Sequence, residues 1–438
     1  MNGRQLLTLT IFGVCYVYLS VGRRLKSVVV WAVALLLVGL GLTTPAAALR
    51  SINWNVIGTF LGTSVVAHLF SRSGVPLLLA RKLVERSRTE GTAMLLVCLL
   101  GGFVSAWVDN VATILIVAPV ALAMADHMGE DPTPFIIGLA LSSNLQGSAT
   151  LIGDAPSMIL AGYSGMGFND FFWFMGRAGL FFAVQFGAAA SALVLRRLFR
   201  KNAEPVAPIP VTPVSSWVPT VLLAGTIAAL ALLNVFDVSF PYKTGAACVA
   251  AGAIGLSWHY APRLGAVGLR GVARNVADRL RWFNWDTVFL LMGLFVVVGS
   301  LSEVGLVDLI ADAIRSVTGG SLLLTFLALV WISVILSGFI DNIPYVTALV
   351  PVVIALGKST GGGPRDVYAL LFGLLIGATV GGNITPIGAS ANVVSVAMLE
   401  RRGLHVSFGR FMRIGVPFTV VATLAATAFI WVFWILIP

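Results

Sequence analysis

Two Asp-Asn pairs, Asp109-Asn110 and Asp341-Asn342, stand inside otherwise apolar sequence. An aspartate near the centre of a bilayer costs about 2.5–3.5 kcal/mol on insertion scales, so such residues are usually functional. Burial raises the pKa of a carboxyl group and a bound cation lowers it, so a balanced carboxylate can exchange a proton for a cation. A carboxylate bonded to the backbone is the structural alternative, but the pair occurs twice. We therefore predict that both aspartates bind the coupling ion.

Each acid is followed directly by a neutral oxygen ligand, the amide of Asn110 or Asn342. Hard cations prefer oxygen ligands, as calcium and magnesium do. The four side chains of Asp109, Asn110, Asp341 and Asn342 are thus the candidate sodium ligands. The coupling ion is then H+ or Na+, and no organic cofactor is expected.

A second set of polar residues interrupts two apolar spans, 133–161 and 366–398. The interruptions read SSNLQGSATLIGD at 142–154 and GGNITPIGASAN at 381–392. Glycine and proline break the helical ladder, which leaves carbonyls, amides and helix ends to meet an ion. A glycine packing seam is the structural alternative, although seams rarely need so many polar side chains. The candidate ligands from the breaks are Asn144, Gly147, Thr150, Asp154, Gly382, Asn383, Thr385, Ser390 and Asn392.

The composition places these residues in a membrane. Charged residues are 11% and hydrophobic residues 58% of the chain, with a mean hydropathy of +0.96, whereas soluble domains hold roughly 25% charged residues. The fold is therefore predicted to be all-α and polytopic, with about ten transmembrane helices of about 20 residues each. The clearest apolar runs are 27–49, 171–195, 216–236 and 414–437.

Internal similarity divides the chain into two related halves. SAWVDNVATILIVAPV at 105–120 resembles SGFIDNIPYVTALVPV at 337–352, and ATLIG at 149–153 resembles ITPIG at 384–388. The two segments at 49–55 and 280–286 match at nearly the same offset, as do two phenylalanine pairs. We predict an N-terminal repeat over 1–196, a cytoplasmic linker over 197–215 and a C-terminal repeat over 216–438.

Each half contains a segment that is typical of a re-entrant helical hairpin, 92–125 and 321–357. The Asp-Asn pair lies in the middle of each segment and is expected to form the tip of the hairpin. A polar tip at membrane depth must be buried in protein or face water. The amphipathic segments 73–89 and 303–318 precede the hairpins and are expected at opposite interfaces.

Basic loops between spans orient the halves. The net charge of +10 lies mostly in these loops, which indicates an inner (plasma) membrane protein rather than one that binds nucleic acid. Spans 54–71 and 285–301 then run in opposite directions, so the repeats are inverted and both termini lie outside the cytoplasm. The acidic turn 126–131 also falls inside, which is tolerable because acidic residues orient weakly. The basic loops include Arg23, Arg24, Lys26, 72–88, 196–201, 263–281 and 401–413.

The histidines, the cysteines and two arginines near span ends are expected to have structural rather than functional roles. His68 is expected to pack, His127 and His405 to be solvated, and Arg177 and Arg413 to anchor span ends. Cys15, Cys98 and Cys248 are expected to pack in apolar runs. The sequence contains no phosphate-binding loop and no G-x-S-x-G or H-E-x-x-H motif, so an enzyme is not expected.

The hairpin and break segments, over most of residues 52–420, resemble the ArsB/NhaD permeases of the ion transporter superfamily. That group includes arsenite permeases, NhaD-type sodium–proton antiporters and the melanosomal P protein, with the dicarboxylate/sodium symporters as distant relatives. The resemblance implies scaffold and transport domains that work as an elevator, and a homodimer. Asp109-Asn110-Val111 and Asp341-Asn342-Ile343 stand where the symporters bind sodium with Ser-Asn-Thr.

The resemblance is divided between subgroups. Gln146, Ser148, Ala155 and Ser157 depart from the usual first break, and ITPIG is closer to the arsenite permeases. The Asp-Asn tips and ASANVV are closer to the antiporters and the P protein. We predict a secondary active transporter, coupled to protons or sodium, and favour Na+/H+ antiport. Arsenite or antimonite efflux and dicarboxylate-type anion transport stay open, and an ion channel is the rival from another class.

Overall fold

The computed structural model describes residues 1–22, 25–202, 204, 213–236, 239–279, 283–359 and 363–437. The predictions that involve Arg23, Arg24 and Arg281, and residues 203 and 205–212 of the linker 197–215, lie outside the described residues.

Helices make up nearly all of the first half. They are α1 (Gly3–Val21), α2 (Lys26–Gly39), α3 (Pro45–Ser51), α4 (Trp54–Ser71), α5 (Val75–Glu85), α6 (Glu90–Ser105), α7 (Asn110–Met128), α8 (Thr133–Gly147), α9 (Ala155–Ser164) and α10 (Leu180–Phe199), with the short turn η1 (Asn169–Phe171). A two-residue antiparallel pair, β1 (Trp173–Phe174) and β2 (Arg177–Ala178), joins Trp173 to Ala178 and Phe174 to Arg177.

The second half is also helical. Its helices are α11 (Val218–Val235), α12 (Lys243–Arg279), α13 (Trp285–Glu303), α14 (Leu306–Thr318), α15 (Leu322–Ser337), α16 (Asn342–Ser359), α17 (Pro364–Gly381), α18 (Ser390–Glu400) and α19 (Phe408–Ile430), with the 3-10 turn η3 (Gly382–Ile384) and the π-helical segment η4 (Trp431–Leu436).

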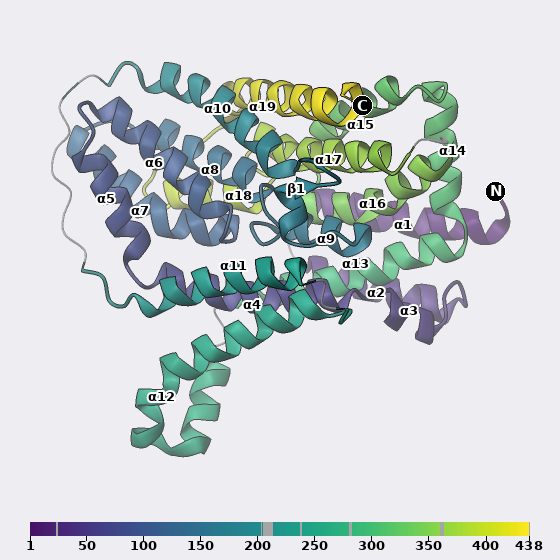
Figure 1. Ribbon diagram of the computed structural model, residues 1–438, viewed down its shortest axis with the longest axis horizontal. Coiled ribbons are helices and arrows are strands. Elements are labelled where there is room, and N and C mark those ends of the chain that lie inside the picture. Colours follow the sequence, from purple (N-terminus) through teal and green to yellow (C-terminus); the bar gives the residue numbers. More distant parts are fainter. Residues whose placement is uncertain are drawn as a thin grey trace.

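Both predicted hairpins are present, α6 with α7 and α15 with α16. Figure 1 shows them at opposite ends of the long axis, with α5 at one end and α14 at the other. The tips, residues 106–109 and 338–341, point toward the middle of the molecule, and their last residues, Asp109 and Asp341, line one cavity. Helices α8 and α17 pack beside the hairpins in the two halves and hold the broken spans next to the tips.

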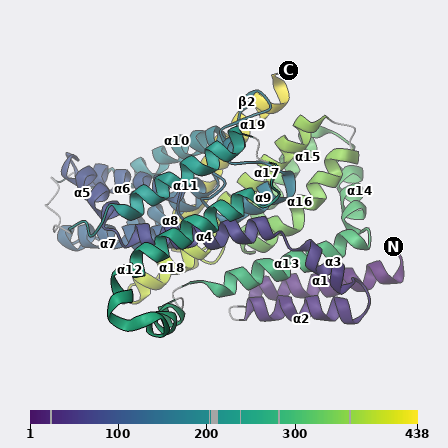
Figure 2. The ribbon, with the colours of Figure 1, turned by 60° about the horizontal axis from the view of Figure 1, so that its bottom comes forward.

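A second group of helices flanks this assembly. Helix α12 packs along α4, and α2 packs along α13 (Figure 2). The first pair is close because glycines face it: a Cβ at Gly62 would come within 2.0 Å of the Cys248 backbone. Small residues let membrane helices approach in this way. These two helix pairs lie beside the hairpins.

Capping side chains begin the inner helices at matching positions in the two halves. Asn53 Oδ1 accepts a bond from Val56 N at 3.1 Å to start α4. Asn284 Oδ1 accepts one from Thr287 N at 3.3 Å to start α13. An asparagine oxygen satisfies one of the free N–H groups of a first helical turn. The repeated N-W-[ND] pattern at 53–55 and 284–286 is thus a pair of helix starts.

Three predicted spans have different bounds. The run 27–49 is not one helix: α2 ends at Gly39, and the chain turns through Gly41, whose φ of 67° favours glycine. Thr44 and Pro45 then begin α3, since proline suits the first helical position. The run 171–195 begins as a helix only at Leu180, after β1 and β2. The run 414–437 begins earlier, at Phe408, because Ser407 caps α19.

Among the described residues, seven helices are long and apolar enough to cross a membrane, or eight if the bent pair α14–α15 counts as one span. The predicted number, about ten, included 27–49 and 133–161, which the structure divides into shorter helices. The chain is therefore an all-α polytopic membrane protein.

The acidic turn 126–131 lies against the basic segment after α18. Arg402 Nη1 donates to both carboxylate oxygens of Asp126 at 2.8 Å, and Arg410 pairs with Asp131. The two segments are thus at the same end of the molecule, as the charge pattern of the loops required. Both pairs are substantially exposed, so they contribute little to stability.

Candidate ion-binding site

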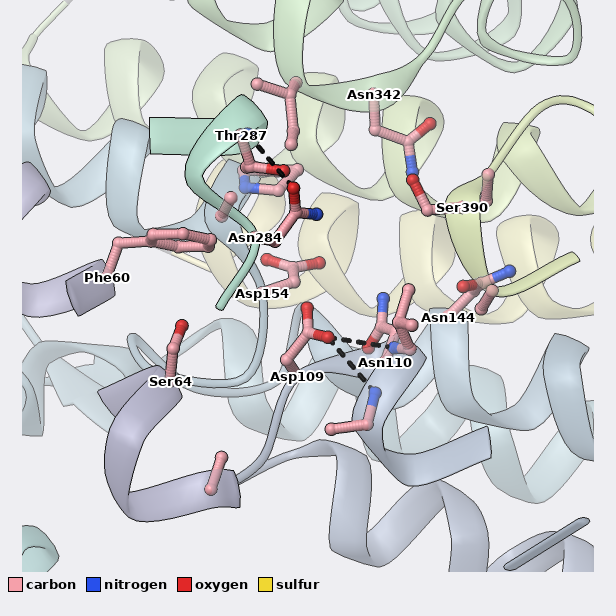
Figure 3. A pocket seen from close by; sticks show the side chains of 18 of the residues that line it. Phe60, Ser64, Asp109, Asn110, Asn144, Asp154, Asn284, Thr287, Asn342 and Ser390 are labelled. Carbon is pink, nitrogen blue, oxygen red and sulfur yellow. Dashed lines mark hydrogen bonds between the residues drawn. The ribbon is translucent and has the colours of Figure 1, made fainter. Parts of the chain in front are cut away.

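Both Asp-Asn tips line one cavity of about 250 Å³ (Figure 3). Helix α4 and the start of α13 form one wall, and the two hairpins and two breaks form the rest. Seven predicted site residues lie on its lining: Asp109, Asn110, Asn144, Asp154, Asp341, Asn342 and Ser390.

In the first half, the tip is held by its own polar side chains. Asp109 Oδ1 accepts bonds from Val111 N at 3.0 Å and Ala112 N at 3.2 Å, which caps α7. Ser105 Oγ donates to Asn110 Oδ1 at 2.6 Å across the hairpin. The structural reading of Asp109 as a helix cap is therefore correct, but this cap uses only Oδ1.

The second half repeats these contacts. Asp341 Oδ1 accepts a bond from Ile343 N at 3.2 Å, and Ser337 Oγ donates to Asn342 Oδ1 at 2.5 Å. Asp341 Oδ2 lies 3.6 Å from Lys26 Nζ. Both tips therefore present a carboxylate oxygen that the cap does not use.

The breaks support the tips from behind. A Cβ at Gly147 would lie 2.3 Å from Asn110 Oδ1, and one at Gly382 would lie 2.9 Å from Asn342 Oδ1. Thr150 Oγ1 donates to the Ala106 carbonyl at 2.5 Å, and Thr385 makes the same bond to Gly338. The predicted site residues Gly147, Thr150, Gly382 and Thr385 thus position the tips and do not line the cavity.

Three asparagines join the two breaks. Asn144 Nδ2 donates to Asn383 Oδ1 and to Asn392 Oδ1, both at 2.8 Å. Asn392 Nδ2 donates to the carbonyls of Gly382 and Thr385 at 2.9 Å, and Asn383 Nδ2 donates to Leu141 O at 3.1 Å. Because both partners present oxygens, the Asn144 amide has only one satisfactory orientation.

That orientation leaves Asn144 Oδ1 without a hydrogen-bond partner among the described residues, although Asn144 is only 1% exposed. Leaving such an acceptor unsatisfied costs about 1–3 kcal/mol. Since Asn144 lines the cavity, this oxygen is suited to a cation or to a hydrogen-bond donor.

A third acid distinguishes the first half from the second. Asp154 Oδ1 caps α9 by accepting from Ser157 N at 2.8 Å, and the residue is 4% exposed. The corresponding start of α18, at Ala389, has no side-chain cap. Three aspartates therefore line the cavity, and the described residues of its lining include no lysine or arginine. No three acidic, His or Cys side chains in the described part of the chain lie close enough to hold a metal ion together.

Sequence reasoning missed several lining residues. Asn284 and Thr287 line the cavity at the start of α13, and the repeated N-W-[ND] pattern was their signal. No sequence pattern pointed to Phe60 and Ser64 on α4, which also line the cavity. His68 was expected to pack but also lines the cavity, because α4 forms its wall.

The remaining candidates lie elsewhere. Asn383 and Asn392 contact Asn144 and do not line the cavity. Arg177 Nη1 donates to the carbonyls of Phe433 at 2.5 Å and Ile437 at 2.6 Å, which is an anchoring role. His127, His405 and Arg413 are exposed, and the three cysteines are buried and free.

A family model described as citrate transporter (CitMHS) matches residues 16–377 and 280–438. A protein named uncharacterized transporter from Mycobacterium tuberculosis is 32% identical, over 98% of each chain. A 46 kDa membrane protein of Mycobacterium leprae is 30% identical over the same shares. The human P protein is 27% identical over 85% of this chain and 52% of its own length.

Among solved structures, the YdaH transporter of Alcanivorax borkumensis has the same fold. The two structures align with a TM-score of 0.57 over 98% of each chain, at 16% sequence identity.

Proposed function

The chain belongs to the citrate transporter family of membrane transporters, and from this premise we propose that it exchanges a small cation, Na+ before others, for protons. The observation that carries the proposal is the lining of the central cavity. Three aspartates and the unpartnered Asn144 oxygen belong to it, and the described residues of the lining include no lysine or arginine, although Lys26 lies beside Asp341. Such a lining attracts cations and repels anions, the more so where water is scarce.

In this proposal Asp109 and Asp341 each take a cation or a proton in turn. The caps at Oδ1 fix both carboxylates, while the amide oxygens of Asn110 and Asn144 are neutral ligands for a dehydrated ion. Carboxylate and amide oxygens are the ligands that hard cations prefer in proteins. Among the described residues, the acids alone do not cluster into a metal site, so the amide oxygens would be needed as well.

We further propose that the hairpins and broken spans move together against α2, α4, α12 and α13. The matched contacts of the two tips favour two inverted repeats, over 1–196 and 216–438 with the linker between them. In such a carrier, two related halves exchange conformations around one central site. The location in the inner membrane, the outward termini and a homodimer belong to the same proposal.

Two alternatives have a specific observation in their favour. The family description names citrate, but an anion with several carboxylates would meet three aspartates in this cavity. Arsenous acid is neutral and carries O–H donors, which Asn144 Oδ1 and the carboxylate oxygens outside the caps could accept.

A flux assay separates these candidates. Purified protein in proteoliposomes is given an imposed pH gradient and offered sodium, citrate or arsenite. We expect proton movement that depends on sodium and is lost in Asp109→Asn and in Asp341→Asn. Gln146→Leu, which breaks a Gln146–Gln185 amide pair outside the cavity, serves as the matched control. If citrate or arsenite alone moves protons, the cation proposal is wrong.

A further inference from the structure

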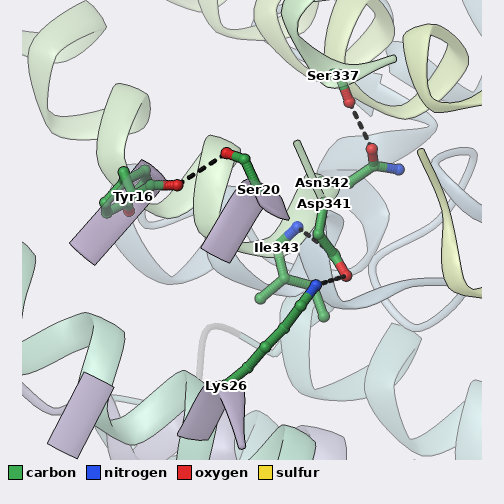
Figure 4. A network of polar contacts seen from close by, with 7 residues as sticks. All are labelled: Tyr16, Ser20, Lys26, Ser337, Asp341, Asn342 and Ile343. Carbon is green, nitrogen blue, oxygen red and sulfur yellow. Dashed lines mark hydrogen bonds and ion pairs between the residues drawn. The ribbon is translucent and has the colours of Figure 1, made fainter. Parts of the chain in front are cut away.

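The two tip acids differ in their charge environment. Lys26 Nζ lies 3.6 Å from Asp341 Oδ2, with 26% and 20% of the two side chains exposed (Figure 4). No lysine or arginine in the described part of the chain forms such a pair with Asp109. Of the two tip aspartates, Asp341 is therefore the one that has a basic side chain beside it among the described residues.

The lysine belongs to the surroundings of the hairpin. Lys26 is the first residue of α2, which packs along α13. The next residue, Ser27, donates to Asp286 in the first turn of α13 and so fixes the start of α2 there. Lys26 therefore reaches the hairpin tip with its side chain, from a helix anchored elsewhere.

Helix α1 makes a second polar contact with the same tip. Tyr16 Oη donates to the Pro344 carbonyl at 2.8 Å, only three residues beyond Asp341. The Tyr16 contact uses a backbone carbonyl and carries no charge. The pair α1–α2 thus holds the second hairpin through one neutral bond and one ion pair.

The first half offers a comparison. Lys243 is the first residue of α12, which packs along α4 as α2 packs along α13. Lys243 interacts electrostatically with Asp170 in the loop before β1. The lysine at the start of α12 thus acts on a loop acid, whereas Lys26 acts on a tip acid.

We propose that Lys26 is a tethered counterion of Asp341, which holds this carboxylate when no transported cation is bound and is displaced when one binds. The proposal rests on the proposed cation exchange. An ammonium and a cation cannot both neutralise one carboxylate oxygen at contact distance, so the two compete. Release of Lys26 also removes the charged contact between α2 and the hairpin. Cation binding at Asp341 would therefore free the second hairpin to move.

Transport kinetics test the competition. Lys26→Met should lower the KM for the coupling cation about fivefold, the effect of losing a partly exposed ion pair of about 1 kcal/mol. Lys26→Arg should keep the wild-type KM, and Lys243→Met is the matched control that leaves Asp341 unchanged. Because Asp341→Asn is expected to abolish transport, the double variant is compared by equilibrium sodium binding, which Lys26→Met should not change further in an Asp341→Asn background. An unchanged or raised KM in Lys26→Met overturns the proposal.

A cross-linking measurement tests it without transport. Cysteines replace Tyr16 and Pro344 in a chain whose three native cysteines are changed to serine. Cross-linking should be fast without sodium and several-fold slower with saturating sodium, and Lys26→Met should remove this sodium dependence. A cross-linking rate that is the same with and without sodium overturns the inference, even if the flux assay has established sodium exchange. If the wild type moves no cation at all, the proposed function fails instead.

Discussion

At the scale of single residues, the central feature is the amide oxygen of Asn144, which has no hydrogen-bond donor among the described residues. Asn383 and Asn392 both turn their oxygens toward Asn144, so its amide nitrogen faces them and its oxygen is left without a hydrogen-bond partner among the described residues. The three side chains come from two breaks that are far apart in the chain. Their bonds fix an acceptor on a residue that lines the same cavity as three aspartates, which suits the cation that we propose.

Substitution of Asn144 separates its two roles. Asn144→Leu should raise the KM for the coupling cation at least tenfold, since a ligand worth about 1.5–3 kcal/mol is removed. Asn144→Asp keeps the outward oxygen but loses the donor to Asn383 and Asn392, so we expect lower thermal stability with cation binding retained. Equal KM values in Asn144→Leu and the wild type would contradict the assigned role.

Substitution of Asp154, the additional aspartate of the first half, can likewise separate a role as helix cap from a role in cation binding. An asparagine at position 154 can still cap α9, because its oxygen can accept from Ser157 N. Asp154→Asn should therefore keep the melting temperature while raising the cation KM several-fold. Asp154→Ala should also lose the cap, at about 1 kcal/mol. A melting curve and a sodium titration measure the two effects. Equal KM values in all three proteins would make Asp154 purely structural.

At the scale of elements, each hairpin tip is supported by a glycine in the neighbouring break. The approach is closest in the first half, where Gly147 lies against Asn110. Gly147→Ala should push the Asn110 side chain away and abolish transport, whereas Gly225→Ala in α11 meets open space and should leave transport unchanged. Flux in proteoliposomes and the melting temperature are the measurements. Full activity in Gly147→Ala would show that the tip can shift without consequence.

The sequence was sufficient for the elements that carry polar residues in apolar runs. Asp-Asn twice at one offset, with glycine and proline in two later spans, predicted the hairpins and the breaks. The turn at Gly41 was missed because the hydrophobic run around it is continuous, although Gly41 and Pro45 are turn residues. The contact of Lys26 with Asp341 and the orientation of Asn144 depend on residues hundreds of positions apart, which no local pattern encodes.

At the scale of the whole molecule, the two hairpins enter from opposite ends and meet at one cavity (Figure 1). The ion pairs of Asp126 and Asp131 with Arg402 and Arg410 place the acidic turn at the end that holds the last basic loop. Helix α14 lies at the other end.

Thiol labelling tests this arrangement. In a cysteine-free chain, Asp126→Cys and Arg402→Cys should react with a membrane-impermeant maleimide from the same side, which the charge pattern of the loops predicts to be the cytoplasmic side. Asp308→Cys in α14 should react from the opposite side. Labelling of positions 126 and 402 from different sides of sealed vesicles would contradict the fold.

The central claim is that the cavity binds a cation, and equilibrium binding of radioactive sodium to the purified protein tests it most directly. We predict saturable binding that protons displace, that citrate does not displace, and that Asp109→Asn and Asn144→Leu each weaken at least tenfold. Absence of sodium binding, together with saturable binding of citrate or arsenite to the same protein, would contradict the account.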